Sequence, residues 1–456
     1  MLTATVTQPL LFQDEALGPL EWRFDQPHAS SDGGAVLLQR IDRRVRLIDR
    51  LAAVLADPRD PSRIDHTLRD LLAQRIFGIA CGHADANDAD ALAHDPIHKQ
   101  LLDRDPLTGH RLASQPTLSR FEQQPSPRDL YRLGESLADT VIASLRRRCR
   151  STKVITLDLD ATADPTHGAQ QLTFFNGFYD TWCYLPLVAT LAFDAAPRQY
   201  LVAALLRPGN TAGATGVVGL LRRLIPKVWR AFPRARIRVR LDSGFATPAI
   251  FADLESAGVE YVVGMAGNAV LDRLAAPHLA ALRAQVGATG ETATTFHEAM
   301  YQAKTWPHAR RVIIKAEVVA HPGREPRDNP RFVITNLRHG AATLYQDIYC
   351  ARGDSENRIK ELHALGLGRT SCTRFWANQF RVLLTAAAYA LLQPLQICAD
   401  QTALRGAQIP RLRQALITIG VWIRRQGRRL ICHAPRGHPE QRAWSQIARA
   451  LGATTR

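Results

Sequence analysis

Three acidic residues at remote positions are the best candidates for chemistry in this chain of 456 residues. Asp160 ends an alternating apolar stretch, Asp242 ends a second one, and Glu356 lies in a charged segment with helical character. Carboxylate oxygens are the ligands that Mg²⁺ prefers in proteins. Two such ions can activate a water molecule or a 3′-hydroxyl group and stabilise the leaving oxygen in phosphoryl transfer. The residue types therefore predict a divalent-metal site that acts on a phosphodiester.

The first acidic position has two candidates. Asp158 and Asp160 are two residues apart in one predicted strand, so their side chains share a face of the sheet. Asp160 stands at the end of the strand, whereas Asp158 lies one pleat further inside. We prefer Asp160 as the metal ligand and keep Asp158 as the alternative.

The segment Tyr349–Glu361 predicts the helix that carries the third acid. It has no proline, and apolar residues before, within and after it recur at helical intervals. Residues three and four apart share a helix face, which places in one row Tyr349, Arg352, Glu356, Lys360 and His363. A carboxylate between two cations suits a metal beside a phosphate, so Tyr349, Arg352 and Lys360 are predicted to contact DNA. The alternative is an exposed face with ordinary intrahelical ion pairs.

The elements that must position these residues begin at residue 151. Three strands come first, and helices then alternate with two further strands. The expected elements are strand Lys153–Asp160, strand Tyr184–Phe193, strand Tyr200–Leu206, helix 212–231, strand Arg236–Leu241, helix 247–257 and strand Tyr261–Met265. This β-β-β-α-β-α-β order is the ribonuclease-H-like order, with acids at the ends of its first and fourth strands.

The predicted fold class is therefore α/β. We expect a ribonuclease-H-like mixed sheet with a β-rich insertion, preceded by an all-helical N-terminal domain and followed by a basic C-terminal region. The expected parts are a helical DNA-binding domain (1–150), the first part of the core (151–265), the insertion (266–342), the second part of the core with the glutamate helix (343–400) and the basic region (401–456).

The charge of the chain indicates a polyanionic partner. The formal net charge is +16 and the pI is about 10.1. Codon bias in a GC-rich genome would explain arginine in place of lysine, but not the scarcity of acids after Arg405, where Glu440 stands alone. Four arginines bracket a predicted turn between strands 415–423 and 428–432, and we predict that they hold DNA phosphates: Arg424, Arg425, Arg428 and Arg429.

Several of these segments together resemble a DDE transposase of bacterial insertion sequences, close to the group named thirteen-eighty. The likeness covers nearly the whole chain and is strongest from 154 to 390. The segments are Leu157-Asp158-Leu159-Asp160-Ala161-Thr162, His167-Gly168-x-Gln170, Leu206-Arg207-Pro208-Gly209-Asn210, Asp242-Ser243-Gly244-Phe245 and Tyr349-Cys350-Ala351-Arg352-Gly353-x-x-Glu356-Asn357-Arg358-Ile359-Lys360-Glu361.

The resemblance implies cleavage of DNA and strand transfer of an insertion sequence. It implies two Mg²⁺ ions, for which Mn²⁺ can substitute, on Asp160, Asp242 and Glu356. The implied partners are double-stranded DNA, as terminal inverted repeats and target, and a second copy of the chain in a homodimeric synaptic complex. The place of action would be the bacterial cytoplasm, on the nucleoid. The competing interpretations are a nuclease of the same fold without strand transfer and a regulator with an inactive core.

Two features of this chain can be compared with residues that the family uses, namely the end of its helix signature and an insertion tryptophan. Its wider clan carries the signature Tyr-x2-Arg-x3-Glu-x6-Lys, whose last position here is His363, so Lys360, one turn earlier, is the candidate for the phosphate-binding role. Relatives stack an insertion tryptophan on a flipped base, and Trp306 is the tryptophan of segment 266–342. Packing within the insertion is the interpretation of Trp306 that we favour.

Other stretches carry weaker signals. Ser114–Glu122 fits a recognition helix of a helix-turn-helix and an ordinary bundle helix equally well. The His- and Asp-rich stretch 82–95 could suggest a metal site, but helix caps and a turn explain it better. Val382–Leu392 is too short to span a bilayer and is expected to be a buried helix. Seven scattered cysteines without a C-x-x-C pair fit a reducing cytoplasm.

Overall fold

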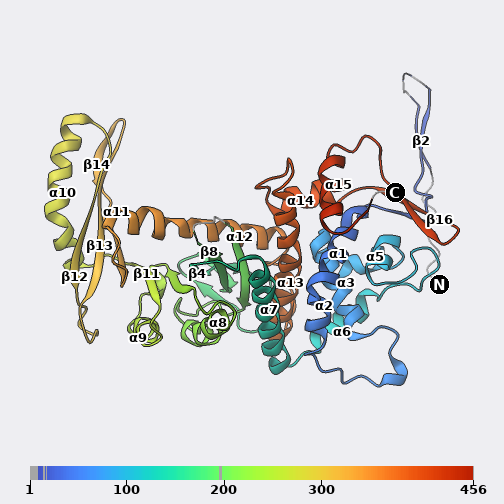
Figure 1. Cartoon of the computed structure of the whole chain (residues 1–456), viewed down its shortest axis with the longest axis horizontal. Helices are drawn as coiled ribbons and strands as arrows, with labels where there is room; N and C mark the ends of the chain where they lie inside the picture. The colour runs from blue at the N-terminus through green and yellow to red at the C-terminus, as the bar shows by residue number, and fades with distance from the viewer. Residues whose placement is uncertain (1–8, 14–15, 17, 195–197, 455–456) are drawn as a thin grey trace. The chain divides into compact units, whose positions relative to one another are not determined.

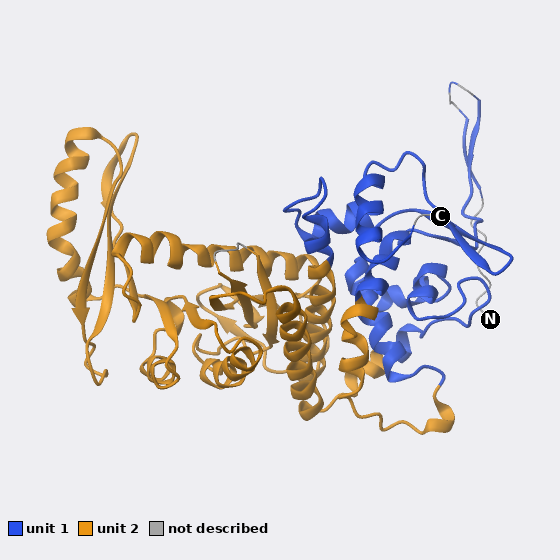
Figure 2. Cartoon of the chain, in the orientation of Figure 1, with its two compact units in different colours: residues 1–41, 65–118, 395–456 blue, residues 42–64, 119–394 orange. Residues whose placement is uncertain are grey.

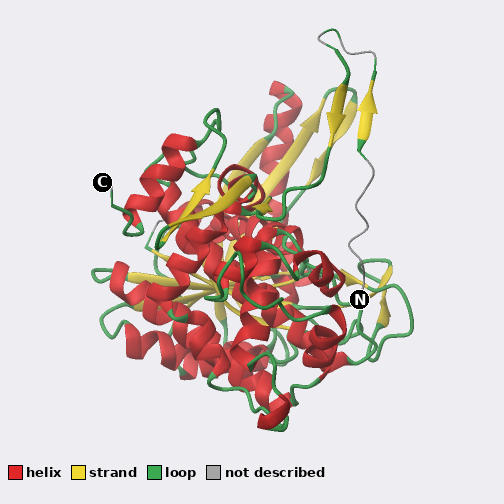
Figure 3. Cartoon of the chain, turned by 90° about the vertical axis from the view of Figure 1, so that its right-hand side faces the viewer, coloured by secondary structure: helices red, strands yellow, loops and turns green. Residues whose placement is uncertain are grey.

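The computed structural model describes residues 9–13, 16, 18–194 and 198–454. The chain forms two compact units, each built from stretches that are far apart in the sequence. Unit 1 comprises residues 1–41, 65–118 and 395–456, and unit 2 comprises residues 42–64 and 119–394 (Figure 2). Helices and strands occur throughout, so the protein is a mixed α/β structure (Figure 3).

Unit 2 is organised around one large mixed sheet of nine described strands in the order β12-β13-β15-β11-β10-β4-β8-β9, with β14 paired to β13. Strands β10 and β11 run parallel to β4, whereas β8 and β9 continue the sheet in antiparallel fashion. The strands are β4 (Val154–Ala161), β8 (Leu187–Phe193), β9 (Gln199–Leu205), β10 (Arg236–Leu241), β11 (Glu260–Met265), β12 (Ala293–Tyr301), β13 (Arg310–His321), β14 (Arg324–Asp328) and β15 (Arg331–Thr335).

The five strands expected from the sequence are present with ends shifted by a few residues. The structure adds a small sheet between β4 and β8, which the sequence did not predict, in the order β5-β7-β6: β5 (Asp164–Pro165), β6 (Phe174–Asn176) and β7 (Thr181–Tyr184). The expected insertion is not only β-rich, because it opens with the helix α10 (Ala269–Thr289). Its strand β15 pairs with β11, so the insertion strands extend the central sheet.

The longer helices of unit 2 pack against the rest of the unit through buried apolar side chains. Several begin at a side chain that accepts a backbone N–H or at a proline in the first turn, as Ser126 and Pro127 do for α7, whereas α2 and α8 have neither. The helices are α2 (Leu47–Ala52), η2 (Pro61–Arg63), α7 (Pro127–Arg148), α8 (Val217–Ala231), η4 (Ser243–Phe245) and α9 (Pro248–Ser256).

A continuous helical run from residue 341 to residue 364 carries the predicted glutamate. It is not a uniform α-helix: α11 (Ala341–Thr343) passes into the π-helical stretch η5 (Leu344–Tyr349), the 3₁₀ turn η6 (Cys350–Arg352) and α12 (Gly353–Ala364). In Figure 1 this run, in orange, extends from the insertion strands to the strands β4 and β8. Mid-helix π and 3₁₀ segments often mark functional positions.

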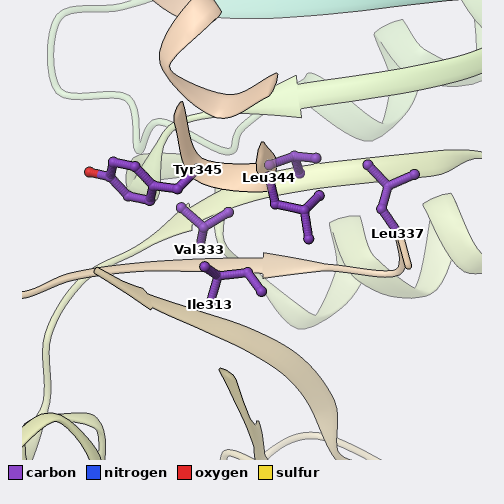
Figure 4. Packing of buried hydrophobic residues seen from close by; sticks show 6 residues of the cluster. Ile313, Val333, Leu337, Leu344 and Tyr345 are labelled. Carbon is purple, nitrogen blue, oxygen red and sulfur yellow. The ribbon is translucent and has the colours of Figure 1, made fainter. Parts of the chain in front are cut away.

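The π-helical stretch is fixed by a buried apolar cluster. Leu344 and Tyr345 pack against Ile313, Val333 and Leu337, which come from the insertion strands and the loop after them (Figure 4). Burial of such side chains contributes about 1.5–3 kcal/mol each. The insertion therefore holds the start of the glutamate run in place.

Helix α13 (Phe375–Ala399) differs from the prediction that it ends at Pro394. The proline lies inside the helix, between the buried residues Leu392 and Leu395, whose packing offsets the lost backbone hydrogen bond. The side chain of Gln393 makes two hydrogen bonds with β9. Its Nε2 donates to Gln199 O at 2.9 Å, and its Oε1 accepts from Leu201 N–H at 3.2 Å. Among described helices, α13 alone is long and apolar enough to cross a membrane, and most of its apolar window is buried.

Unit 1 combines both ends of the described chain. A three-stranded sheet β17-β16-β3 joins an N-terminal strand to a C-terminal hairpin. The expected all-helical region thus contains short strands, and residues 415–417, expected as the start of a strand, belong to a π-helical stretch. The elements are β1 (Leu10–Phe12), β2 (Leu20–Trp22), β3 (Ala29–Ser30), η1 (Gly33–Ala35), α3 (Leu68–Cys81), η3 (Ala86–Asp88), α4 (Ala89–Leu92), α5 (Pro96–Leu101), α14 (Ile409–Leu412), η7 (Arg413–Ile417), β16 (Val421–Gln426), β17 (Arg429–His433) and α15 (Gln441–Ala450); α1 (Val36–Val45) and α6 (Gln115–Gln123) each run from one unit into the other.

Gly34 packs directly against the backbone of Leu416 in unit 1. A Cβ atom at this position would lie 1.7 Å from the Leu416 carbonyl oxygen, so only glycine fits. The neighbouring Gly33 donates its N–H to Ile419 O at 2.9 Å. The N-terminal Asp32-Gly33-Gly34 segment, which the sequence marks as a turn, is therefore a contact with the C-terminal segment 416–421.

Candidate active site

Asp160 and Asp242 meet at one edge of the central sheet. Strand β4 pairs with β10 in parallel so that Asp158 lies opposite Arg240, and each acid follows two residues later. Asp242 begins η4 and accepts the N–H of Gly244 at 2.7 Å. Asp160 is mostly buried, and burial and the neighbouring charge of Asp242 both raise the pKa of its carboxyl group. Two acids remote in the sequence thus share one electrostatic environment.

Arg352 links the two carboxylates. Its Nη1 atom lies 2.8 Å from Asp160 Oδ2 and 3.9 Å from Asp242 Oδ2. Ser355, one turn further along, donates its hydroxyl to the same Asp160 oxygen at 3.2 Å. The charges of Asp160 and Asp242 raise the pKa of the guanidinium, and burial opposes them as the largest single effect. The predicted role of Arg352 as a cation at this edge fits its position.

Asp158 is engaged in a different interaction. Arg240 binds it in bidentate fashion, with Nε to Oδ1 at 2.5 Å and Nη2 to Oδ2 at 2.8 Å, and Gln199 adds a hydrogen bond at 3.0 Å. The carboxylate is 1% exposed, and burial raises its pKa while Arg240 lowers it. Because both oxygens are occupied, Asp158 fits a structural ion pair better than a metal ligand.

Glu356 lies on α12, in the same helical run as Arg352, but its contacts differ from those of Arg352. Its side chain is exposed, and among the described residues it forms no hydrogen bond or ion pair with Asp160 or Asp242. The residues of the helical run that bond Asp160 are Arg352 at the end of η6 and Ser355 in α12. The convergence of three acids therefore stays a prediction, whereas that of two is present in the structure.

The other residues of the predicted row differ in their surroundings. The Tyr349 hydroxyl lies beside Gly264, where a Cβ would be 2.4 Å from the hydroxyl oxygen and 3.3 Å from the Asp242 carbonyl carbon. Lys360 is exposed. His363, at the signature position of lysine, is part-buried, with Nε2 3.1 Å from Thr162 Oγ1, and burial lowers its pKa. A neutral His363 is thus a poor substitute for the lysine, which leaves Lys360 as the available cation.

The four predicted phosphate-binding arginines lie on the exposed β16–β17 hairpin of unit 1. Gly427, at φ 57°, makes its turn. Arg424 donates to His433 at 3.0 Å, and Arg425 forms an ion pair with Asp105. Arg428 and Arg429 have no ion pair among the described residues. The two arginines next to the turn are therefore the freest to bind an anion.

A second group of metal-ligating side chains lies in unit 1. Asp32 Oδ2 is 2.8 Å from Nε2 of both His83 and His98, and these contacts lower the pKa of Asp32 to about 2, against the effect of burial. Two ligands of a tetrahedral metal ion would be about 3.3 Å apart, so these distances are those of hydrogen bonds. Within stretch 82–95, Asp85 and Asp95 cap helices as expected, while His83 joins this cluster.

Two further features noted in the sequence, Trp306 and the helix that begins near Ser114, can be compared with the structure. Trp306 is buried and packs against Phe251 and Tyr301, both at 5.3 Å between ring centroids, so the favoured packing interpretation is confirmed and extends to the core helix α9. Helix α6 follows the short α5 only after the connection 102–114, which is longer than the three- or four-residue turn of a helix-turn-helix.

Sequence reasoning missed Arg240, Ser355 and the exposed aromatic residues of the β6–β7 turn. Arg240 carried a signal, because a cation at a buried position of an alternating strand needs a buried acid. Ser355 carried none, since its partner depends on the rotation of α12. The aromatic residues were visible as Phe174-Phe175 and Phe178-Tyr179, but their exposure was not.

Comparisons with known proteins identify relatives of the chain. A family model described as transposase DDE domain group 1 matches residues 16–455. A search of curated proteins finds no match. Among solved structures, the piggyBac transposase synaptic complex with hairpin DNA is similar at 11% identity and a TM-score of 0.41, over 94% of this chain and 83% of that chain. That structural similarity is too low to assign residues or partners.

Proposed function

Because the chain belongs to the group 1 family of transposase DDE domains, it is a DNA transposase, and we propose that Asp160, Asp242 and Glu356 form its active site. The reaction is cleavage of DNA and strand transfer of an insertion sequence. The observation that carries the proposal is the meeting of Asp160 and Asp242 at one guanidinium, that of Arg352, 2.8 and 3.9 Å away. Buried acids beside one another are a common arrangement of functional sites.

The metal of the proposed site is Mg²⁺, bound as two ions, with Mn²⁺ able to substitute. Members of the family generally use divalent metal ions. The donor set fits, because two carboxylates compete for one cation and repel each other, which a divalent ion would relieve. When bound, the ions supply Lewis-acid stabilisation of the transferring phosphate. The planar guanidinium of Arg352 matches a DNA phosphate as well as a carboxylate, so Arg352 would be available to hold a phosphate at the loaded site.

The core that holds the site is proposed to be ribonuclease-H-like. Support comes from the strand order β9-β8-β4-β10-β11, with β8 and β9 antiparallel and β10 and β11 parallel to β4. In this order the first and fourth core strands, β4 and β10, are neighbours, and both proposed aspartates stand at their ends. The exposed Glu356 would complete the set from the helix that passes over the same edge.

The proposed partners are double-stranded DNA and a second copy of the chain, with the nucleoid of a bacterial cytoplasm as the place of action. The net charge of +16 and the exposed arginines of the β16–β17 hairpin support DNA. An element has two ends and the chain carries one proposed acidic set, so a homodimer supplies one active site for each end.

A cleavage and joining assay tests the proposal. The full chain is incubated with Mg²⁺, a labelled element end and a supercoiled target plasmid. Asp160→Asn, Asp242→Asn and Glu356→Gln each abolish both products while DNA binding and thermal unfolding stay as in the wild type. Asp347→Asn, an exposed acid of the same helical run, is the matched control and retains activity.

The outcome separates the competing functions. Cleavage without joined products would favour a nuclease, and full activity of Glu356→Gln would remove the third acid from the proposed set. Normal cutting by Asp160→Asn would show that the first acid is another residue.

A further inference from the structure

The small sheet β5-β7-β6 exposes an unusual number of aromatic side chains. Phe178 is 88% exposed and Trp182 57% exposed, and Phe175 lies directly opposite Trp182 in the β6–β7 pairing. The rings form two edge-to-face pairs, Phe178–Tyr179 at 4.9 Å and Phe175–Trp182 at 6.4 Å between centroids. Large apolar groups gathered on a surface indicate a binding site, because exposing them to water is unfavourable.

The turn that carries these rings is held rigidly. Asn176 Oδ1 accepts the N–H groups of Phe178 at 3.0 Å and Tyr179 at 3.3 Å, and its Nδ2 donates to Gly209 O at 2.7 Å. Gly209 permits this contact, since a Cβ there would lie 2.0 Å from the Cys183 carbonyl oxygen. The rings are thus presented in a preorganised form, which lowers the entropic cost of binding.

The loop behind the turn is itself anchored. Arg207 donates Nε to Leu185 O at 2.9 Å and Nη1 to Gly213 O at 2.7 Å and Thr215 O at 3.0 Å. The Leu206–Asn210 segment, one of those that carry the family resemblance, therefore supports the aromatic turn (Phe174–Trp182) through Asn176 and Gly209.

The aromatic turn lies beside the proposed active site. It belongs to the small sheet that lies in the chain between β8 and β4, the strand that ends with Asp160 and Ala161. The loop behind it also touches the turn at Asp242, because a Cβ at Gly213 would lie 2.9 Å from the carbonyl oxygen of Gly244, the residue whose N–H bonds Asp242. The pKa of the Tyr179 phenol is raised first by partial burial and then by the charges of Asp160 and Asp242. A DNA phosphate at the carboxylates would bring its neighbouring nucleotides to these rings.

We propose that the aromatic turn, defined as Phe174–Trp182, binds unpaired nucleobases of the DNA end by stacking. The inference rests on the proposed function, since a phosphate at Asp160 and Asp242 supplies the adjacent bases. Exposed flat apolar rings match nucleobases, and stacking of bases on aromatic side chains is a common way to bind unpaired strands. Trp306 is buried and has no free face for this role.

A fluorescence and binding assay on the full chain tests the inference. The probe is a duplex end that carries 2-aminopurine either paired or in a two-nucleotide unpaired extension, with divalent ions chelated so that no cleavage occurs. Wild-type protein changes the 2-aminopurine fluorescence of the unpaired probe, and Phe178→Ala together with Trp182→Ala loses that change and binds this probe about 10-fold more weakly. Binding of the fully paired probe stays within about twofold.

Two further variants make the result specific. Phe178→Trp with Trp182→Phe keeps two aromatic rings and restores the signal, and Tyr131→Ala, an exposed aromatic residue on α7, behaves as the wild type. Equal losses on paired and unpaired probes, or an unchanged unpaired signal, would overturn the inference. Loss of self-association by the double alanine variant with an intact signal would assign the turn to a second copy of the chain instead.

Failure of this inference is distinguishable from failure of the proposed function. If Asp160→Asn abolishes cleavage while the aromatic variants bind both probes normally, only the stacking role is wrong. If Asp160→Asn cleaves normally, the proposed active site is wrong whatever the probes show.

Discussion

At the scale of single residues, the position of Arg352 makes it the cation on which the site depends. Replacement by alanine removes the only charge that balances Asp160 and Asp242 among the contacts described for them. Loss of a charge-assisted bond costs about 1.5–3 kcal/mol, so strand transfer by Arg352→Ala is expected to slow roughly 10- to 150-fold. The acidic limb of the profile of joining rate against pH should also move to higher pH, because Asp160 loses the charge of Arg352, which lowers its pKa.

Single-turnover joining rates between pH 5 and pH 9 measure both effects. Arg338→Ala, an exposed arginine in the loop before the helical run, serves as the control. Wild-type rates for Arg352→Ala would mean that this helix face has no part in catalysis.

Asp158 is expected to behave differently from its neighbour Asp160. Asp158→Asn leaves Arg240 buried with no counter-charge, which typically costs about 3–5 kcal/mol. Asp160→Asn should leave the stability nearly unchanged and remove activity. Urea unfolding followed by circular dichroism measures the difference. Asp158→Leu combined with Arg240→Met should regain most of the stability. A double variant as unstable as the single one would show that the unpaired charge of Arg240 is not the cause of the loss.

Asp164 gives the protein a dependence on pH. It is fully buried, Thr370 donates to one of its oxygens at 2.6 Å, and burial raises its pKa to about 7 from 3.8. Between these two values the folded protein holds a proton that the unfolded chain has released, so the free energy of unfolding falls as pH rises from about 4 to about 7. Asp164→Asn removes this dependence, and its stability relative to the wild type should be higher at pH 8 than at pH 5. Urea midpoints at both pH values check the sign, and an identical difference at the two would contradict it.

At the scale of elements, the β16–β17 hairpin should bind DNA through its turn. Arg428 and Arg429 have no ion pair among the described residues, whereas Arg425 is paired with Asp105. Neutralising both turn arginines should lower the slope of log affinity against log salt by about 1.8, since each phosphate contact contributes about 0.9. Arg425→Gln should change it less. Titrations at four salt concentrations measure the slopes, with Arg283→Gln in α10 as the control; equal slopes for all variants would exclude the hairpin as a DNA contact.

The sequence predicted the strands of the core well and the helical run less well. Strands β4 and β10 follow from alternation and β-branched residues, which act locally. The π-helical stretch at Leu344–Tyr349 depends on packing against Ile313 and Val333, which are near it only in the folded chain. Pro394 was expected to end α13, but buried neighbours outweigh the one lost hydrogen bond.

The same distinction applies to the site. Asp160 and Asp242 could be predicted because each stands at the end of a recognisable strand, and parallel neighbours end at the same edge. The orientation of Glu356 could not, because a step of one residue in α12 separates Ser355, which bonds Asp160, from Glu356, which is exposed. The aromatic turn was missed because exposure is a property of the tertiary structure.

At the scale of the whole molecule, the two units should respond separately to substitution. Gly34→Ala forces a methyl group into the Leu416 carbonyl and is expected to destabilise unit 1 by several kcal/mol. Gly219→Ala in α8 of unit 2 meets no atom within 4 Å and should be neutral or stabilising by up to about 1 kcal/mol. Scanning calorimetry of the full chain measures both, and a Gly34→Ala protein with unchanged transitions would show that the observed packing is not what holds unit 1.

The contact between Gly34 and Leu416 has a consequence for folding of the protein during its synthesis on the ribosome. About 380 residues separate the two, and at about 5–20 residues per second their synthesis takes roughly 20–75 seconds. Until then the segments 1–41 and 65–118 have emerged without the C-terminal strands on which they pack, while residues 119–394 already have the strands of their sheet. An early stop or frameshift that removes the last 60 residues or so would therefore leave the catalytic strands complete and deprive unit 1 of its partner strands. Such a truncated protein would keep Asp160, Asp242 and Glu356 but lose the β16–β17 hairpin, which we propose binds DNA.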